Sequence, residues 1–125
     1  MNSYYLLTIA AFYNLAFAIF HAFFWKLFGW REALAPLTPI NRLVMQVLNL
    51  CLMFVFLVFA YVSAFHTGEL LTTSLGRTLL FSIALFWFLR AVEQVIFGGL
   101  KAKLSVAFFG IFLVGTLLYL IPALS

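Results

Sequence analysis

Four long apolar runs divide this chain and restrict its possible folds more than any other feature. They cover approximately residues 4–26, 40–65, 75–97 and 103–121. An apolar run of about 20 residues is long enough to cross the hydrocarbon core of a bilayer as a helix. Only helices and closed barrels satisfy their own backbone there, and continuous rather than alternating apolar residues exclude a barrel. We therefore predict an all-α integral membrane protein: one domain, residues 1–125, forming an up-down antiparallel bundle of four transmembrane helices.

Composition excludes the soluble classes. Hydrophobic residues make up 67% of the chain and charged residues 8%, whereas soluble domains average roughly 45–50% apolar and about 25% charged residues. The formal net charge of +4 does not indicate a nucleic-acid partner, because the basic residues flank the apolar runs instead of forming one solvated face. The first run has no basic residue before it and is too long for a cleaved signal peptide, so we expect the mature protein to keep it.

The positive charges predict the orientation of the helices. Six of the seven basic residues fall at one set of alternating run ends: Lys26, Arg31, Arg42, Arg90, Lys101 and Lys103. The opposite ends carry only Arg77. Because Lys and Arg accumulate on the cytoplasmic side, we expect both termini on the non-cytoplasmic side, in a bacterial inner (plasma) membrane. Four tyrosines are expected in the aromatic belt near that outer boundary: Tyr4, Tyr5, Tyr61 and Tyr119.

Helix boundaries have local signals. Thr38 is expected to cap the second helix, with Pro39 in its first turn, where a missing amide costs nothing. One of residues 72–74 is expected to cap the third helix. Gly98 and Gly99 are expected to end it, and the short connection that follows makes the third and fourth helices antiparallel neighbours.

The few polar residues inside the apolar runs gather at one level. The first run contributes His21, with Asn14 and Trp25 on the same face. The second contributes the stripe Arg42, Gln46 and Asn49, and the third contributes Arg90, Glu93 and Gln94. At about 1.5 Å of rise per residue, most of these side chains lie roughly 7–14 Å beneath the cytoplasmic boundary. Polar groups at membrane depth are costly and usually face a bundle interior or a wet cavity, so we predict a shared polar site.

Energetics predict pairing on the third helix. An unpaired Arg and an unpaired acid at the membrane centre together cost roughly 5–7 kcal/mol. The spacing of Arg90 and Glu93 permits an ion pair on one helix. We therefore expect that pair, with the remaining hydrogen bonds taken by Gln46, Asn49 or His21.

Two interpretations of this polar site stay open. In the first, it binds a lipid or other amphiphile with an anionic head group, and Phe-rich walls hold the tail. Arg42 and Arg90 bind the head, and further contacts come from Gln46, Asn49, Gln94, Trp25 and Asn14. If the protein is an enzyme, which the sequence leaves open, His21 and Glu93 are the candidate catalytic acid and base. In the second interpretation the same residues join helices by hydrogen bonds.

The second interpretation implies a non-catalytic accessory or structural subunit of a larger membrane complex. A third hypothesis is a small proton-coupled transporter, in which Glu93 titrates inside a homo-oligomer. We expect membrane lipids as partners in every case. No cofactor or metal is expected, because His21 and His66 fall at opposite ends of the helices and cannot ligate one haem, and no His/Cys cluster is present. The single cysteine, Cys51, excludes an intrachain disulfide.

Overall fold

The computed structural model describes residues 2–125, which are helical throughout except for short connections and contain no strand. Four helices are long and apolar enough to cross a membrane: α1 (Ser3–Ala22), α4 (Pro39–Phe65), α6 (Ser74–Glu93) with its π-helical continuation η1 (Gln94–Gly98), and α7 (Lys103–Leu124). Three short helices connect them: α2 (Phe24–Leu27), α3 (Trp30–Ala33) and α5 (Thr67–Thr72). The four predicted runs are therefore confirmed as helices.

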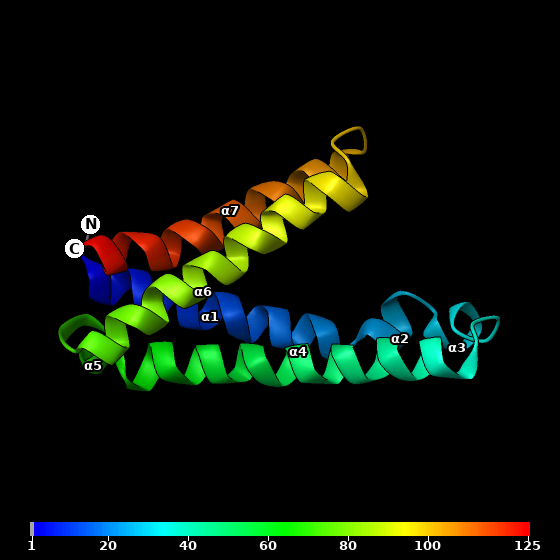
Figure 1. Ribbon diagram of the computed structural model, residues 1–125, viewed down its shortest axis with the longest axis horizontal. Helices are drawn as coiled ribbons and strands as arrows, with labels where there is room; N and C mark the ends of the chain where they lie inside the picture. The colour runs from blue at the N-terminus through cyan, green and yellow to red at the C-terminus, as the bar shows by residue number, and fades with distance from the viewer. Residues whose placement is uncertain (1) are drawn as a thin grey trace.

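The long helices form two antiparallel pairs that are splayed apart (Figure 1). We call α1 with α4 the first arm, and α6 with η1 and α7 the second arm. The arms meet at the end that holds α5 and both termini, and they separate toward the other end (Figure 1). We call these the closed end and the open end. The structure differs from a compact four-helix bundle in one respect: the two antiparallel pairs separate, and contacts between the arms are concentrated toward the closed end.

Packing explains why the arms meet at one end and separate at the other. The fully buried side chains Leu7, Leu70, Leu80 and Tyr119 lie at or near the closed end, and Trp87 on α6 extends the core toward the cleft by packing against Phe17 and Phe56. Helix α4 buries only Asn49, Phe56 and Ser63, which are seven residues apart and form one narrow seam. Partly buried residues such as Leu52 and Phe59 flank this seam, and the face away from it is exposed and mostly apolar, as expected of a helix that faces lipid.

Several predicted helix ends are confirmed. The Thr38 hydroxyl accepts a hydrogen bond from the Asn41 amide at 3.4 Å, and Thr73 accepts one from the Gly76 amide at 2.9 Å. After η1, Gly99 has φ of 69°, a left-handed conformation that favours glycine, and it turns the chain toward α7.

Two helix ends differ from prediction. Helix α1 stops at Ala22 rather than continuing to residue 26, and α2 starts separately after Phe23. Helix α7 continues past Pro122 to Leu124, beyond the predicted end at residue 121. The Arg77 guanidinium donates to the carbonyls of Ala123 and Ser125, so a side chain from α6 satisfies the exposed acceptors of the last turn.

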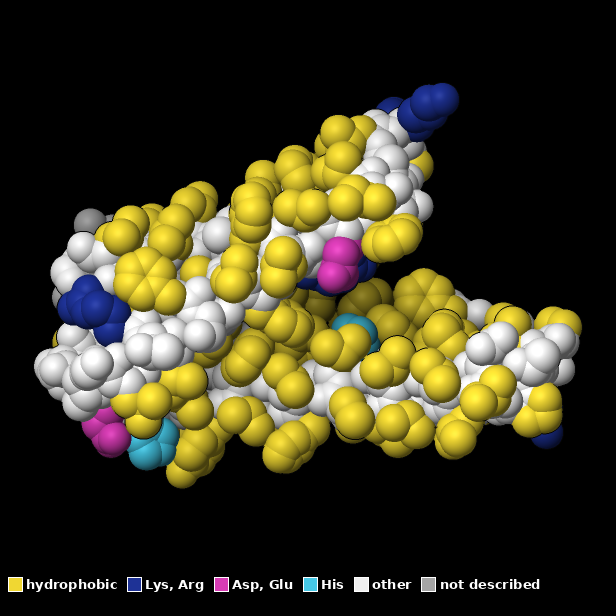
Figure 2. All heavy atoms as spheres, in the orientation of Figure 1, with side chains coloured by type: hydrophobic (Ala, Val, Ile, Leu, Met, Phe, Trp, Pro, Cys, Tyr) yellow, Lys and Arg dark blue, Asp and Glu magenta, His cyan; other side chains and the backbone are white. Residues whose placement is uncertain are grey.

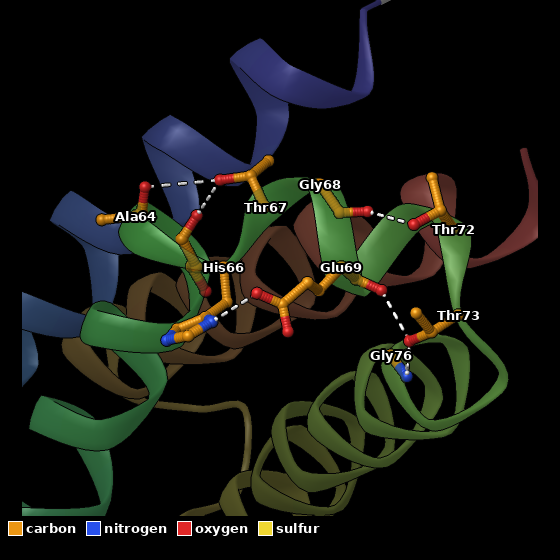
Figure 3. Close-up of polar contacts among 9 residues, drawn as sticks. Ala64, His66, Thr67, Gly68, Glu69, Thr72, Thr73 and Gly76 are labelled. Atoms are coloured by element: carbon orange, nitrogen blue, oxygen red, sulfur yellow. Dashed lines mark hydrogen bonds and ion pairs between the residues drawn. The ribbon is translucent and has the colours of Figure 1, made fainter.

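The connection between α4 and α6 at the closed end is itself helical. Residues 67–72 form α5, and its threonine hydroxyls donate to backbone carbonyls one turn earlier: Thr67 to Ser63 and Thr72 to Gly68, both at 2.7 Å (Figure 3). His66 Nδ1 lies 3.0 Å from Glu69 Oε1 on the surface of this corner (Figure 3).

Tyr119 corrects the predicted aromatic belt. Its side chain is 0% exposed, and its hydroxyl lies 2.6 Å from Asn14 Nδ2 and 2.6 Å from Ser63 Oγ. We call Asn14, Ser63 and Tyr119 the polar hub, since it joins α1, α4 and α7. The tyrosine lies here because an amide on α1 and a hydroxyl on α4 satisfy its own hydroxyl inside the protein. Tyr4, Tyr5 and Tyr61 are exposed as expected.

Candidate binding cleft

A cavity of about 530 Å³ lies between the arms on the open side of the core. Figure 2 shows the hollow between the arms with mostly hydrophobic walls. All four long helices contribute aromatic side chains to these walls: Phe17, Phe20, Phe24, Phe56, Phe86, Trp87, Phe108 and Phe112 line it, with Phe24 coming from α2 directly after the α1 break. The polar side chains that line it are His21 on the first arm and Arg90, Gln94 and Ser105 on the second.

Arg90 is the only formally charged side chain among the residues that line this cavity. Its guanidinium carbon lies 4.4 Å from the centre of the Phe112 ring, and its Nη2 donates to Gln94 Oε1 at 3.1 Å. The predicted ion pair with Glu93 is wrong. Glu93 is exposed, and no Lys or Arg within residues 2–125 makes a salt bridge with any carboxylate.

Helix geometry explains why Arg90 contacts Gln94 instead of Glu93. At 3.6 residues per turn, a side chain four positions on is offset by about 40° and one three positions on by about 60° in the other direction. Gln94 therefore follows Arg90 on the cavity side, while Glu93 is exposed and does not line the cavity. No carboxylate of residues 2–125 makes a salt bridge with the guanidinium, and Glu93 acts on it only over a longer distance.

A chain of hydrogen bonds fixes the Arg90 wall. Gln94 Nε2 donates to Ser105 Oγ at 2.9 Å, and that hydroxyl donates to the Gly99 carbonyl at 2.5 Å. Gly98 permits this arrangement, because a Cβ there would lie 2.7 Å from Gln94 Nε2 and 2.9 Å from Ser105 Oγ. The π-helical turn of η1 carries both Gln94 and Gly98, and such turns often occur at functional sites. Sequence analysis missed Ser105, since a lone serine near a helix start has no distinguishing pattern.

The opposite wall is organised around the break in α1. Asn49 on α4 donates from Nδ2 to the His21 carbonyl at 3.0 Å, and its Oδ1 lies 2.8 Å from His21 Nδ1. Because α1 ends one residue later, this amide adds a side-chain donor to a carbonyl in the last turn of α1, beside the break. The imidazole also stacks on Phe24, with ring centres 4.2 Å apart.

The remaining predicted site residues lie elsewhere. Arg42 and Gln46 are partly buried on α4 but do not line the cavity, and neither makes a side-chain hydrogen bond within residues 2–125. Trp25 is exposed and packs edge-on against Trp30, while Asn14 belongs to the polar hub. The structure therefore brings His21, Arg90 and Gln94 to one cavity, with Asn49 directly behind His21. It does not join the two walls by a hydrogen bond within the described chain.

No group of three His, Cys, Asp or Glu side chains within residues 2–125 is placed to hold a metal ion. Chemically, the cleft offers a cation, several hydrogen-bonding groups and an aromatic chamber. No protein-family model, no curated protein and no solved structure matches this chain.

Proposed function

We propose that the protein is a multi-pass membrane protein whose closed end and both termini lie on the non-cytoplasmic side, with the cleft open toward the cytoplasmic leaflet. The membrane in this proposal is a bacterial inner (plasma) membrane. The lipid-compatible surface of α4 and the distribution of basic residues support it. Arg77, the one Lys or Arg at the closed end, donates to the carbonyls that end α7, so a structural contact accounts for its place there.

Orientation is testable by cysteine labelling. With Cys51 replaced by Ser, single cysteines are introduced as Glu69→Cys or Lys101→Cys, both at exposed positions at opposite ends. A membrane-impermeant maleimide is expected to label the first in intact spheroplasts and the second only after permeabilisation. The reverse pattern would overturn the proposed orientation.

We further propose that the cleft binds an amphiphile with an anionic head group, taken from the membrane lipids. The observation that carries this proposal is Arg90, a cation that lines an aromatic cavity and makes no salt bridge within residues 2–125. An arginine at membrane depth costs about 2.5–3.5 kcal/mol on insertion scales, and such residues usually serve a pathway or ligand. Gln94 and Ser105 hold the guanidinium so that an anionic oxygen completes its hydrogen bonds.

The cavity size supports one tail inside the cleft. A volume of about 530 Å³ lies within the roughly 300–1,000 Å³ of small-molecule sites. A methylene is about the size of a water molecule, whose share of the liquid is about 30 Å³, so roughly 18 such groups fit. That is one long alkyl chain. Rings such as Phe17 and Phe108 provide its apolar walls.

Native mass spectrometry with hexadecyl sulfate, and with hexadecyl maltoside as a neutral probe of equal chain length, tests this function. Arg90→Gln is expected to lose at least about tenfold in hexadecyl sulfate affinity, as a lost charge-assisted hydrogen bond implies. Arg31→Gln is the matched control, because Arg31 is exposed, lies at the same end and makes no side-chain hydrogen bond within the described residues. Equal sulfate binding by both variants, or no preference over the maltoside, would refute the proposal.

An accessory subunit of a larger membrane complex, or a homo-oligomer, is the second candidate. It is favoured by the His21–Asn49 contact, which is satisfied between α1 and α4 and thus joins helices without a ligand. In that case Arg90→Gln lowers thermal stability or oligomer yield and leaves hexadecyl sulfate binding unchanged.

A further inference from the structure

The orientation of the Asn49 amide determines which nitrogen of His21 carries a proton. Asn49 Nδ2 donates to the His21 carbonyl at 3.0 Å, so the Asn49 oxygen is the atom 2.8 Å from His21 Nδ1. An amide oxygen only accepts hydrogen bonds, and therefore Nδ1 must donate. In the neutral imidazole the other nitrogen, Nε2, is then an acceptor.

This acceptor is available to a ligand in the cavity. His21 lines the cavity, and its Nε2 makes no hydrogen bond to any of residues 2–125. The ring cannot turn freely, because Phe24 stacks on it and Phe56 packs against it with centres 5.1 Å apart. Figure 2 shows a histidine in the hollow, with basic atoms on the other arm across from it and an acidic side chain beside them at the rim. One wall thus presents an acceptor and the other a cationic donor.

We propose that the head group bound in the cleft is a phosphate monoester, with one proton held between a phosphate oxygen and His21 Nε2 while Arg90 binds the other oxygens. This rests on the proposed function. The second pKa of a phosphate monoester is about 6, so near neutral pH this head group can carry the one proton that a hydrogen bond to Nε2 needs. The same single proton is therefore present whether it sits on the phosphate or on Nε2, and no atom is gained or lost.

Other anionic heads fit this pair of walls less well. A sulfate monoester or a phosphate diester carries no ionisable proton near neutral pH. Either would place an anionic oxygen against the Nε2 lone pair unless the imidazole took a proton from water. Among the lining residues Arg90 is the only other charged group that faces His21, since α4 contributes Leu52 and Phe56 and α7 no ionisable side chain.

Hexadecyl phosphate and hexadecyl sulfate provide a matched test, because they share a chain and differ in the proton. At about pH 6, near the second pKa of the phosphate, the wild-type protein is expected to bind the phosphate about tenfold to a hundredfold more tightly. In His21→Phe the ratio of the hexadecyl phosphate affinity to the hexadecyl sulfate affinity is expected to fall to about the ratio that the charges of the two head groups alone give. Both probes are still expected to bind through Arg90. A preference that persists unchanged in His21→Phe would overturn the inference.

A second measurement needs no substitution. In protein labelled with ¹⁵N-histidine, with His66 as the internal reference, free His21 is expected to show a protonated Nδ1 and an unprotonated Nε2. Hexadecyl phosphate should then shift the Nε2 signal, and hexadecyl sulfate should not. A protonated Nε2 in the free neutral protein would overturn the inference.

The outcomes separate this inference from the proposed function. Equal, Arg90-dependent binding of both probes overturns the phosphate assignment and leaves the binding of anionic amphiphiles intact. Binding of neither probe overturns both. Displacement of hexadecyl phosphate by inorganic phosphate would keep the head-group assignment and overturn the amphiphile.

Discussion

The polar hub at the closed end makes a quantitative prediction about how the two arms are held together. Tyr119 and Ser63 are both 0% exposed, and the Tyr119 hydroxyl is within 2.6 Å of Ser63 Oγ and of Asn14 Nδ2. Tyr119→Phe removes only this hydroxyl and leaves the ring in place. Ser63 Oγ then has no partner within residues 2–125, whereas Asn14 Nδ2 keeps its bond to the Ala10 carbonyl at 2.9 Å.

The expected loss follows from the two bonds removed. Hydrogen bonds between transmembrane helices contribute about 0.6 kcal/mol on average and up to about 1.7. Two of them, both fully buried, give a loss of about 1–3 kcal/mol in the free energy of unfolding. Ser63→Ala removes one of the same bonds, so the double variant with Tyr119→Phe should show a coupling of about 0.6–1.7 kcal/mol.

Equilibrium unfolding in mixed micelles with increasing sodium dodecyl sulfate measures these values. Tyr61→Phe is the matched control, because Tyr61 is 57% exposed and its hydroxyl has no hydrogen-bond partner within the described chain. It should change stability by less than about 0.5 kcal/mol. The reasoning would be refuted if Tyr119→Phe were no more destabilising than Tyr61→Phe, or if the Ser63 and Tyr119 changes were simply additive.

Three further substitutions test other parts of the structure by thermal unfolding. Gly98→Ala should lower the free energy of unfolding by about 1–3 kcal/mol, because the new Cβ separates Gln94 from Ser105. Gly110→Ala, with open space around it, should leave stability unchanged. Equal effects of the two substitutions would contradict the close packing at Gly98. Asn49→Leu should cost about 1–2 kcal/mol by removing both contacts at the α1 break, and an unchanged midpoint would argue against that role. Arg77→Leu should cost about 0.5–2 kcal/mol by exposing the carbonyls at the end of α7, and no loss would show that solvent replaces it.

The helices and their caps could be predicted from sequence because they depend on nearby residues. Thr38 and Thr73 bond to amides within three positions, and a glycine pair marks the end of η1. Continuous apolar runs likewise determine the four long helices without reference to tertiary contacts. These features are local, and a single sequence contains all the information they need.

The splay of the arms and the break in α1 could not be predicted in this way. No Gly or Pro marks the break at Phe23, and the residue that stabilises it, Asn49, comes from another helix. The polar residues were assigned to one cluster by depth, yet depth does not say which face each helix presents to its neighbours. Asn14 consequently belongs to the closed end, and Arg42 and Gln46 lie outside the cavity.

The polar hub and the cleft differ in how much hydrogen-bonding capacity they leave unused. At the closed end, Tyr119 and Ser63 satisfy each other, and Asn14 Oδ1 is the one buried side-chain atom of the hub without a partner in residues 2–125. At the cleft, the Arg90 guanidinium has five N–H donors and uses one of them within residues 2–125, and His21 uses one ring nitrogen. Spare capacity beside a cavity costs stability in a chain that has polar partners elsewhere. A ligand that supplies anionic oxygens on one side and a proton on the other would recover that cost, which is why the cleft and not the hub is the site of binding in our proposal.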